Sequence, residues 1–388
     1  MYKILTLNNI SPIGLDRLPR DRYEIASEIQ KPDAVLLRSF KMHDMEIPPT
    51  LKAVGRAGAG VNNIPVDRMS KAGVVVFNAP GANANAVKEL VVAGMLLACR
   101  NICQGWNYTV NAADMSDEEL GKAVEAGKKQ YAGFELPGRT LGVVGLGAIG
   151  VKVANAAAAL GMNVIGFDPQ ITVQSAWRLS SDIQQATSID DLFSKSDFVT
   201  FHVPLNDATK NLLNADRLAL MPDNAVILNF ARGGIVDDDA VLAGIGSGKI
   251  YAYVTDFPTN KLRKAERVIT LPHLGASTAE AEENCAVMVA DQVRDYLENG
   301  NILNSVNFPT VNLPRSGMQR LAVVNENRPD MVSQISHVLG GGNVNIVHMV
   351  NESKGDMAYT LLDTDSEMDP GVVDKVKTIK GVLAVRVL

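Results

Sequence analysis

Cysteine is scarce in this chain, and the few cysteines present exclude a disulfide framework. Cys99, Cys103 and Cys285 are an odd number spread over 388 residues, whereas disulfide scaffolds are short, secreted and rich in cysteine. Cys99 and Cys103 have helical i,i+4 spacing with no histidine near them in sequence, which disfavours a metal site. Buried thiols in a reducing cytoplasm are the expected reading, so we expect a cytoplasmic protein without a bound metal.

An excess of positive charge is also lacking. Lysine and arginine total 37 against 43 acidic residues, a net charge of −6, which argues against a general nucleic-acid surface. The first residues, Met1 to Leu7, lack the basic start and the cleavage site of a secretory signal. The apolar stretch from 140 to 167 could be a membrane span, but Lys152 and Asn155 interrupt it. We therefore expect neither nucleic acid nor membrane as a partner.

Short apolar strands alternate with helical stretches along most of the chain. This rhythm predicts two doubly wound, Rossmann-like α/β domains. We expect one domain from residues 1–97 together with a return helix and closing segment at 274–308, and a second from residues 98–273. A proline-containing linker is expected at 309–317.

The tail, residues 318–388, has a different order. Its apolar and helical segments follow the order β-α-β-β-α-β, the ferredoxin-like split unit. Because such a unit exposes sheet edges, we expect it to make a contact between subunits. We also expect the tail to be separable, so that its deletion leaves a competent core.

The segment from Arg139 to Asp168 predicts a dinucleotide site. A strand runs into Gly145, Gly147 and Gly150, then a small-residue helix, then a strand ending at Asp168. The first glycine makes the tight turn, the second lets the pyrophosphate approach the backbone, and the third lets the helix pack closely. An acid about 20 residues further on accepts from the ribose 2′-OH and repels a 2′-phosphate, so NAD is favoured over NADP.

An arginine and a histidine follow two other predicted strands. Arg232 can bind a carboxylate with its planar fork. His273 can accept a hydroxyl proton, since histidine titrates nearest to neutrality. Each residue alone is more often structural, but downstream of a dinucleotide fold the pair predicts oxidation of a hydroxy acid.

The chain resembles the D-isomer-specific 2-hydroxyacid dehydrogenases. The resemblance rests on these segments: GRTLGVVGLGAIG at 138–150, HVPL at 202–205, NFARGGIVDDDAV at 229–241, TD at 255–256 and LPHLGAST at 271–278. Three more segments resemble the members that oxidise 3-phospho-D-glycerate: LRS at 37–39, GRAGAGVNNI at 55–64 and NAPGANANAVKE at 78–89. The tail resembles an ACT domain, a regulatory module. The resemblance implies NAD-dependent formation of 3-phosphohydroxypyruvate, a step toward L-serine, by a homo-oligomer, a dimer or a tetramer.

The resemblance also implies roles for individual residues. Arg232 and His273 are the implied catalytic pair. The implied cofactor-binding residues are Gly145, Gly147, Ala148, Ile149, Gly150, Asp168, His202, Pro204, Ala231, Asp256 and Gly275. The implied substrate-binding residues are Arg38, Ser39, Ala59, Gly60 and Asn78, with Arg56 nearby. The implied effector residues, for L-serine, are Asn325, Asn327 and Asn345.

Two positions depart from the family pattern. A glutamate usually follows the counterpart of Asp256 and orients the catalytic histidine, but Asn260 stands there. Asp256 or Glu266 could take over that role. Asn325 stands where the ACT pattern often has histidine, so we expect serine inhibition to be weak or absent.

Two other functions stay open at this point. The chain could reduce another 2-keto acid, such as hydroxypyruvate or pyruvate. It could also be a non-enzymatic, NAD-sensing protein resembling the corepressors of the same family, which would bind a partner peptide.

Overall fold

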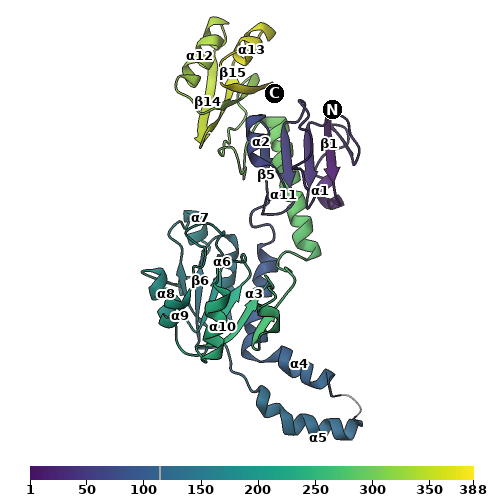
Figure 1. Cartoon of the computed structure of the whole chain (residues 1–388). Coiled ribbons are helices and arrows are strands. Elements are labelled where there is room, and N and C mark those ends of the chain that lie inside the picture. Colours follow the sequence, from purple (N-terminus) through teal and green to yellow (C-terminus); the bar gives the residue numbers. More distant parts are fainter. Residues whose placement is uncertain (113–114) are drawn as a thin grey trace. The chain divides into compact units, whose positions relative to one another are not determined.

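The computed structural model describes residues 1–112 and 115–388, which divide into two compact units (Figure 1). Unit 1 comprises Met1–Ala82 and Ala279–Leu388, and unit 2 comprises Asn83–Thr278. The division lies at 82/83 and 278/279, whereas the expected boundaries were 97/98 and 273/274. Helix α3 (Ala84–Cys99) accounts for the first difference, because Val87, Val91 and Met95 are buried in the core of unit 2.

Unit 2 is built on one parallel sheet with the strand order β12-β11-β10-β9-β6-β7-β8. The chain reverses direction through the sheet between β6 and β9, the switch point of a doubly wound fold. The strands are β6 (Thr140–Val144), β7 (Asn163–Phe167), β8 (Gln184–Gln185), β9 (Phe198–Phe201), β10 (Ala225–Asn229), β11 (Ile250–Thr255) and β12 (Val268–Thr270).

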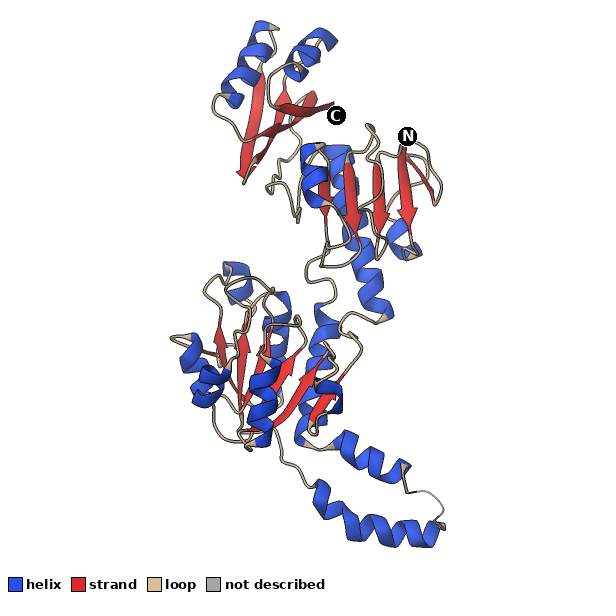
Figure 2. Ribbon diagram, viewed as in Figure 1, coloured by secondary structure: helices blue, strands red, loops and turns tan. Residues whose placement is uncertain are grey.

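Helices cover both faces of this sheet (Figure 2). Apolar side chains of α3 and α6 pack on one face, and those of α8, α9 and α10 pack on the other. The helices of unit 2 after α3 are α4 (Ile102–Val110), α5 (Asp117–Gly127), α6 (Ala148–Ala159), α7 (Val173–Ala176), α8 (Ile189–Lys195), α9 (Ala215–Leu220) and α10 (Asp238–Gly246), with 3-10 turns at Lys128–Tyr131 and Leu262–Lys264. Because the strands of this sheet are all parallel, their carboxyl ends lie at one shared edge, where ligands bind in such folds.

The N-terminal part of unit 1 is a second doubly wound domain. Its parallel strands have the order β2-β1-β3-β4-β5. Its elements are β1 (Tyr2–Leu7), α1 (Pro12–Leu15), β2 (Tyr23–Ala26), β3 (Ala34–Leu37), β4 (Ala53–Arg56), α2 (Val66–Lys71), β5 (Val75–Phe77) and the returning helix α11 (Ala279–Asn299). Val289 and Val293 of α11 are fully buried against this sheet, and so the chain returns to complete the domain it began.

The tail forms the predicted split β-α-β-β-α-β unit. Its antiparallel sheet has the order β14-β15-β13-β16, and a separate apolar core lies between the sheet and its two helices. The elements are β13 (Gln319–Glu326), α12 (Met331–Gly341), β14 (Ile346–Lys354), β15 (Met357–Thr364), α13 (Pro370–Lys377) and β16 (Val382–Val387).

The tail packs closely on the rest of unit 1, a contact that the expectation of a separable tail did not include. Tyr359 and Leu361 of β15 belong to the same buried cluster as Tyr296 of α11. The Tyr359 hydroxyl donates to the Gly300 carbonyl oxygen at 2.6 Å. Within the expected linker, Val311 forms a β-bridge with Ile302. Deleting residues 318–388 would therefore expose apolar core of the remaining unit.

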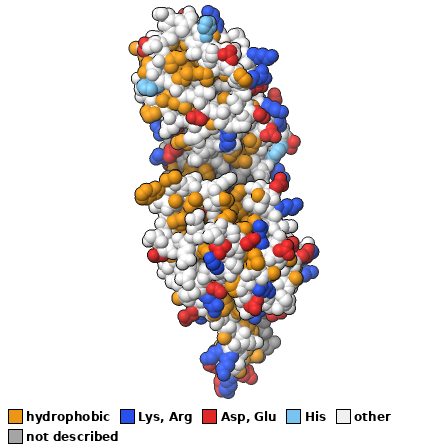
Figure 3. Space-filling model, turned by 90° about the vertical axis from the view of Figure 1, so that its left-hand side faces the viewer, with side chains coloured by type: hydrophobic (Ala, Val, Ile, Leu, Met, Phe, Trp, Pro, Cys, Tyr) orange, Lys and Arg blue, Asp and Glu red, His pale blue; other side chains and the backbone are white. Residues whose placement is uncertain are grey.

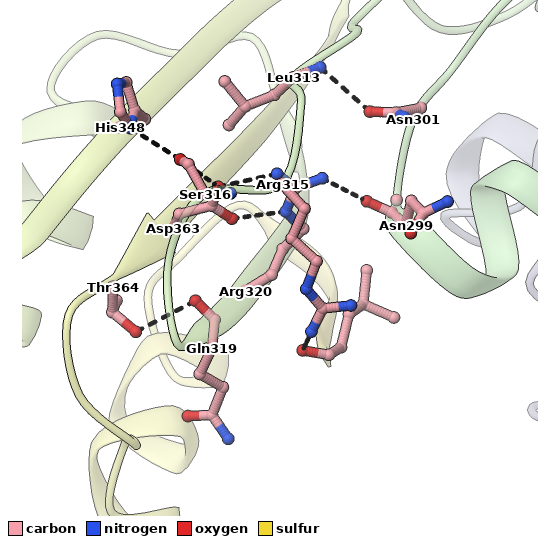
Figure 4. A network of polar contacts seen from close by, with 12 residues as sticks. Asn299, Asn301, Leu313, Arg315, Ser316, Gln319, Arg320, His348, Asp363 and Thr364 are labelled. Atoms are coloured by element: carbon pink, nitrogen blue, oxygen red, sulfur yellow. Dashed lines mark hydrogen bonds and ion pairs between the residues drawn. The ribbon is translucent and has the colours of Figure 1, made fainter.

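A buried ion pair also joins the tail to the end of α11 (Figure 4). Arg320 and Asp363 have no exposed side-chain surface, and two bonds join them: Nε to Oδ1 at 2.5 Å and Nη2 to Oδ2 at 2.8 Å. Nη1 of Arg320 donates to the Asn299 carbonyl oxygen at 2.9 Å. Burial alone would raise the pKa of Asp363, but hydrogen bonds from Arg320 and Ser316 outweigh it and hold that pKa below its ordinary value.

Lysine, arginine and acidic side chains are interspersed on the face drawn in Figure 3, without a broad field of one sign. None of the helices in residues 1–112 and 115–388 is both long and apolar enough to cross a membrane. The same described residues contain no cluster of three or more histidine, cysteine or acidic side chains that could hold a metal ion.

Candidate active site

The residues predicted to bind the cofactor all lie in unit 2, and each follows the carboxyl end of a parallel strand. They come after β6 (Gly145, Gly147, Ala148, Ile149, Gly150), β7 (Asp168), β9 (His202, Pro204), β10 (Ala231), β11 (Asp256) and β12 (Gly275). Since the strands are parallel, the fold brings these segments to one edge of the sheet.

The glycine turn after β6 has the geometry that a dinucleotide needs. Gly145 has a φ of +90°, and a Cβ there would lie 2.6 Å from the His202 carbonyl oxygen. A Cβ on Gly150 would lie 1.9 Å from the Gly145 carbonyl oxygen. At Gly147, by contrast, an added Cβ would meet no described atom within 4 Å. Two glycines are thus required by packing, while the third leaves open space over the helix start.

The open space faces the N-terminus of α6. Gly147 is the N-cap residue, and no described side chain caps this helix. The amides of Ala148 and Ile149 therefore keep their N–H groups for a ligand, where the helix dipole favours an anion. This uncapped end beneath a glycine cradle fits the pyrophosphate of a dinucleotide.

Asp168 is held in place by the backbone. Its Oδ2 accepts from the Leu146 N–H at 2.8 Å, and its Oδ1 accepts from the Gln170 N–H at 2.9 Å. The side chain stays partly exposed. A fixed carboxylate beside the glycine turn fits a ribose with a free 2′-OH.

His202 is a neutral imidazole in this fold. Burial lowers the pKa of His202 to about 3. Its Nε2 lies 3.1 Å from the Thr200 hydroxyl, and its Nδ1 has no hydrogen-bond partner among the described residues. This histidine offers a polar atom without charge.

The loop that carries Arg232 is tied down by Asn229. The Asn229 amide donates to the Arg232 carbonyl oxygen at 2.9 Å, and its Oδ1 accepts from the Ala231 N–H at 3.2 Å. Asn229 is 1 % exposed, whereas Arg232 is exposed, with Nη1 donating only to the Ala231 carbonyl oxygen at 2.7 Å in the described structure. The guanidinium is thus presented on a rigid loop.

His273 stands on an unusual backbone that a buried carboxylate supports. Its φ is +55°, a left-handed conformation that is uncommon outside glycine. Asp256 is 1 % exposed and accepts from the two backbone N–H groups that follow His273, those of Leu274 at 2.7 Å and Gly275 at 2.9 Å. Both oxygens of Asp256 therefore hold the histidine loop. The imidazole is exposed and lies against the Phe257 ring, with centroids 5.0 Å apart.

The other two candidates for orienting His273 lie elsewhere. Glu266 precedes β12 whereas His273 follows it, and Glu266 lines a different cavity together with Asn101 and Arg267. Asn260 accepts from Arg263 Nε at 3.1 Å. Of the alternatives left open by the sequence, only Asp256 reaches the histidine loop.

A cavity of about 380 Å³ opens beside His273. Its wall includes Asp238, Tyr253 and Thr259. The Thr259 hydroxyl donates to Asp238 Oδ2 at 3.1 Å. Burial raises the pKa of Asp238, and the neighbouring Asp239 and Asp237 carboxylates raise it further. Nothing in the sequence distinguished this aspartate from its two acidic neighbours.

The residues predicted to bind substrate gather at the carboxyl ends of β3, β4 and β5 in unit 1. Arg38 and Ser39 follow β3, Ala59 and Gly60 follow β4, and Asn78 follows β5. The Asn78 amide donates to the Ala59 carbonyl oxygen at 2.6 Å. The loop after β3 is fixed by Asn63, which donates to the carbonyl oxygens of Arg38 at 3.2 Å and Phe40 at 2.8 Å.

The three asparagines predicted for an effector are not gathered in one copy of the chain. Asn325 and Asn327 line a cavity of about 440 Å³ in the tail. Asn325 is fully buried, and its Oδ1 has no partner among the described residues. Asn345 precedes β14, which runs parallel to β13, so it lies at the opposite end of the sheet. There its amide donates to Asp365 at 3.2 Å.

Comparisons with known proteins bear on this geometry. Residues 92–275 match the model of the D-isomer specific 2-hydroxyacid dehydrogenase NAD binding domain. The chain is 33 % identical over 356 residues to D-3-phosphoglycerate dehydrogenase of Haemophilus influenzae, covering 89 % of this chain and 83 % of that protein. This chain belongs to the D-isomer-specific 2-hydroxyacid dehydrogenase family. As in that family, unit 2 is an NAD-binding domain.

Further relatives agree with this family assignment. D-3-phosphoglycerate dehydrogenase of Methanocaldococcus jannaschii is 37 % identical over 307 residues, which cover 77 % of this chain and 56 % of that protein. The chain thus spans little more than half the length of that relative. The solved NAD⁺-bound 3-phosphoglycerate dehydrogenase of Entamoeba histolytica has a TM-score of 0.61 at 26 % identity, covering 79 % of this chain and 98 % of the solved one.

Besides Asp238, two residues of this D-2-hydroxyacid dehydrogenase that contact predicted site residues were not foreseen. Asn229 opens the segment that carries Arg232, and its strand-end position could have indicated its bracing role. Glu282 of α11 forms an ion pair with Arg38. A glutamate on a polar helix face gives no signal in the sequence, because its partner is distant along the chain.

Proposed function

We propose that this protein oxidises 3-phospho-D-glycerate to 3-phosphohydroxypyruvate with NAD, the first step of L-serine biosynthesis. The observation that supports a phosphorylated substrate is the pair of arginines at the carboxyl ends of β3 and β4 in unit 1. Two arginines lie there on adjacent strands: Arg38 follows β3 and Arg56 is the last residue of β4. The backbone amides and hydroxyl of the same loops add further donors. In a chain of net charge −6, such a local group suits a phosphate. Two relatives that match most of this chain carry the same activity in their names.

The proposed roles in unit 2 follow from charge and hydrogen-bonding capacity. Arg232 binds the substrate carboxylate with its fork and polarises the neighbouring oxygen. His273 accepts the proton of the C2 hydroxyl, and the C2–H bond breaks with its electron pair. When bound, NAD accepts that pair as a hydride. The 2-hydroxy acid thus becomes a 2-keto acid: its hydroxyl proton goes to His273, and its C2 hydrogen would leave with the electron pair to the bound cofactor.

Cofactor binding is assigned to the edge of the unit 2 sheet. The pyrophosphate is held by the amides of Ala148 and Ile149 above Gly147, and the adenosine ribose by Asp168. Ala231 and Asp256 serve the nicotinamide side, where Asp256 acts chiefly by shaping the loop of His273 and Gly275. His202 and Pro204, which follow β9, are proposed to line the same cofactor site.

Substrate binding is assigned to the loops of unit 1. Arg38, Ser39 and Asn78 serve the phosphate, and the amides of Ala59 and Gly60 serve the carboxylate. Steady-state turnover with 3-phosphoglycerate, hydroxypyruvate and pyruvate tests this assignment. A preference for an unphosphorylated acid would make the protein another D-2-hydroxyacid dehydrogenase. The absence of turnover with Arg232 and His273 intact would favour an NAD-sensing binding protein.

The tail is proposed to be an ACT domain that binds a small effector, with L-serine as the first ligand to test. The cavity beside Asn325 and Asn327 supports a ligand site. Because Asn345 lies at the other end of the sheet, it can join such a site only from a second copy, which supports a homo-oligomer, a dimer or a tetramer.

Serine titration of two point variants tests this regulation. Asn325→His should strengthen inhibition by serine, since histidine is common at this position in the ACT pattern. Asn327→Ala should abolish it and leave basal turnover unchanged. Weak inhibition of the unmodified protein is expected. The same serine response in all three proteins would contradict a serine site at this cavity.

A further inference from the structure

The arginine expected to bind the substrate phosphate is already paired with a carboxylate. Arg38 follows β3, and its Nη1 forms an ion pair with Oε1 of Glu282 on α11. Both side chains are partly exposed, 35 % for Arg38 and 46 % for Glu282. The pair is therefore accessible to a ligand from solvent.

Arg56 lies in the same cluster. Its Nε donates to the Arg38 carbonyl oxygen at 3.0 Å. A Cβ added to Gly58 would lie 2.1 Å from Nη1 of Arg56, so the guanidinium passes directly over this glycine, whose φ is +156°. The bare backbone at Gly58 thus makes room for the arginine beside the loop of Ala59 and Gly60.

The thiol of Cys285 shows that the charges gather in one place. Burial raises its pKa, and the charges of Arg56, Arg38 and Glu282 all act on it. Cys285 lies one turn of α11 after Glu282. Two guanidinium groups and one carboxylate therefore share this corner, and Glu282 offsets positive charge that a phosphate would meet.

We infer that Glu282 is an internal competitor for Arg38, which weakens the binding of phosphorylated substrates. The inference rests on the proposed function, because it takes the phosphate end of the substrate to bind at Arg38. A phosphate brings up to two negative charges and three acceptor oxygens. To form two hydrogen bonds with the Arg38 guanidinium, the phosphate must displace the Glu282 carboxylate from Nη1. The negative charge of Glu282 also repels the phosphate.

The expected effect is modest and has a definite sign. A partly exposed ion pair contributes little free energy, so removing the charge of Glu282 should lower the KM for 3-phosphoglycerate roughly 1.5- to 5-fold. The turnover number should not change, since proton and hydride transfer are assigned to Arg232 and His273 of unit 2, whereas Glu282 belongs to unit 1. The KM for D-glycerate, which lacks the phosphate, should stay constant.

Glu282→Gln is the test variant and Glu280→Gln its matched control. Both residues lie in the first turn of α11, so both variants lose the same favourable interaction with the helix dipole. Only Glu282 pairs with Arg38 in the described structure. We expect a lower KM for 3-phosphoglycerate in the Glu282 variant alone, with a difference that shrinks at high ionic strength. In an Arg38→Gln background, Glu282→Gln should have no effect.

Direct titration of 3-phosphoglycerate onto the full chain, without turnover, separates this inference from the proposed function. Tighter binding to Glu282→Gln than to the unmodified protein supports the inference even if no product forms. Equal or weaker binding would overturn it, because Glu282 would then be neutral or would orient Arg38 for the phosphate. An equal gain for D-glycerate, or a gain that persists without Arg38, would overturn it as well.

Discussion

Asp256 supports the backbone conformation on which the proposed acid–base stands. Each of its oxygens accepts from one backbone amide after His273, and the histidine itself has a left-handed φ of +55°. Backbone strain of this kind persists only where surrounding contacts enforce it. Of the acids considered, Asp256 is the one that the described structure shows bonded to this loop.

Asp256→Asn should therefore impair catalysis, whereas Asn260→Ala should not. An amide has one acceptor oxygen, so one N–H of Leu274 or Gly275 would lose its partner, at a cost of about 1–3 kcal/mol. Turnover and NAD affinity should both fall in the Asp256 variant. Measuring kcat and the KM for NAD checks this. A large loss from Asn260→Ala would show that the asparagine has taken over the orienting role.

His273→Ala should lower turnover roughly 10²- to 10⁴-fold, the usual contribution of a positioned acid–base. Arg232→Lys should also be severe, because an ammonium cannot reproduce the planar fork. His43→Ala, which removes an exposed histidine of unit 1, serves as control. Near-normal kcat in either test variant would refute the role given to that residue.

Asp168→Ala should weaken NAD binding and relax the preference for NAD over NADP. The carboxylate is fixed by two backbone N–H groups and followed by Pro169 and Gln170, which offer no cation to a 2′-phosphate. The kcat/KM ratio for the two cofactors checks this in both proteins. Equal use of both cofactors by the unmodified enzyme would contradict the assignment.

At the scale of elements, the sequence predicted those features that depend on residues close together in the chain. Gly145, Gly147 and Gly150 marked a turn whose spacing depends on adjacent residues, and the turn has the predicted conformation. The order of the tail strands was readable for the same reason. The packing of the tail on unit 1 was not, because Arg320, Asp363 and Tyr359 find their partners only in the folded chain. A proline-containing segment such as 309–317 has the composition of a linker even when, as here, a β-bridge fixes it to the rest of the unit.

The Arg320–Asp363 pair gives a stability prediction. Asp363→Asn should destabilise the protein by about 3–5 kcal/mol, since it leaves a buried arginine uncompensated. Because the pKa of Asp363 is lowered in the folded state, its contribution is present above the unfolded pKa and is lost as pH falls through the folded value. Chemical denaturation at neutral and acid pH checks this. Asp374→Asn, at an exposed pair with Lys377, should change little, and equal stability of the two variants would contradict the account.

At the scale of the whole molecule, the two units carry complementary chemistry. Unit 2 supplies the nucleotide turn, the arginine and the histidine, and its NAD-binding domain is shared with the family. Unit 1 supplies the arginine-bearing edge that would distinguish a phosphorylated substrate. The tail shares a core with the N-terminal part of unit 1, the part that is proposed to bind the phosphate.

The central claim is that this dehydrogenase selects a phosphorylated D-2-hydroxy acid, and the selectivity ratio tests it most directly. The measurement is NADH formation from 3-phosphoglycerate and from D-glycerate, with the unmodified protein and with Arg38→Gln. We predict a much higher kcat/KM for 3-phosphoglycerate in the unmodified protein, and a ratio that collapses in the variant through a raised KM. Equal turnover of both acids by the unmodified protein, or an unchanged ratio without Arg38, would contradict the account.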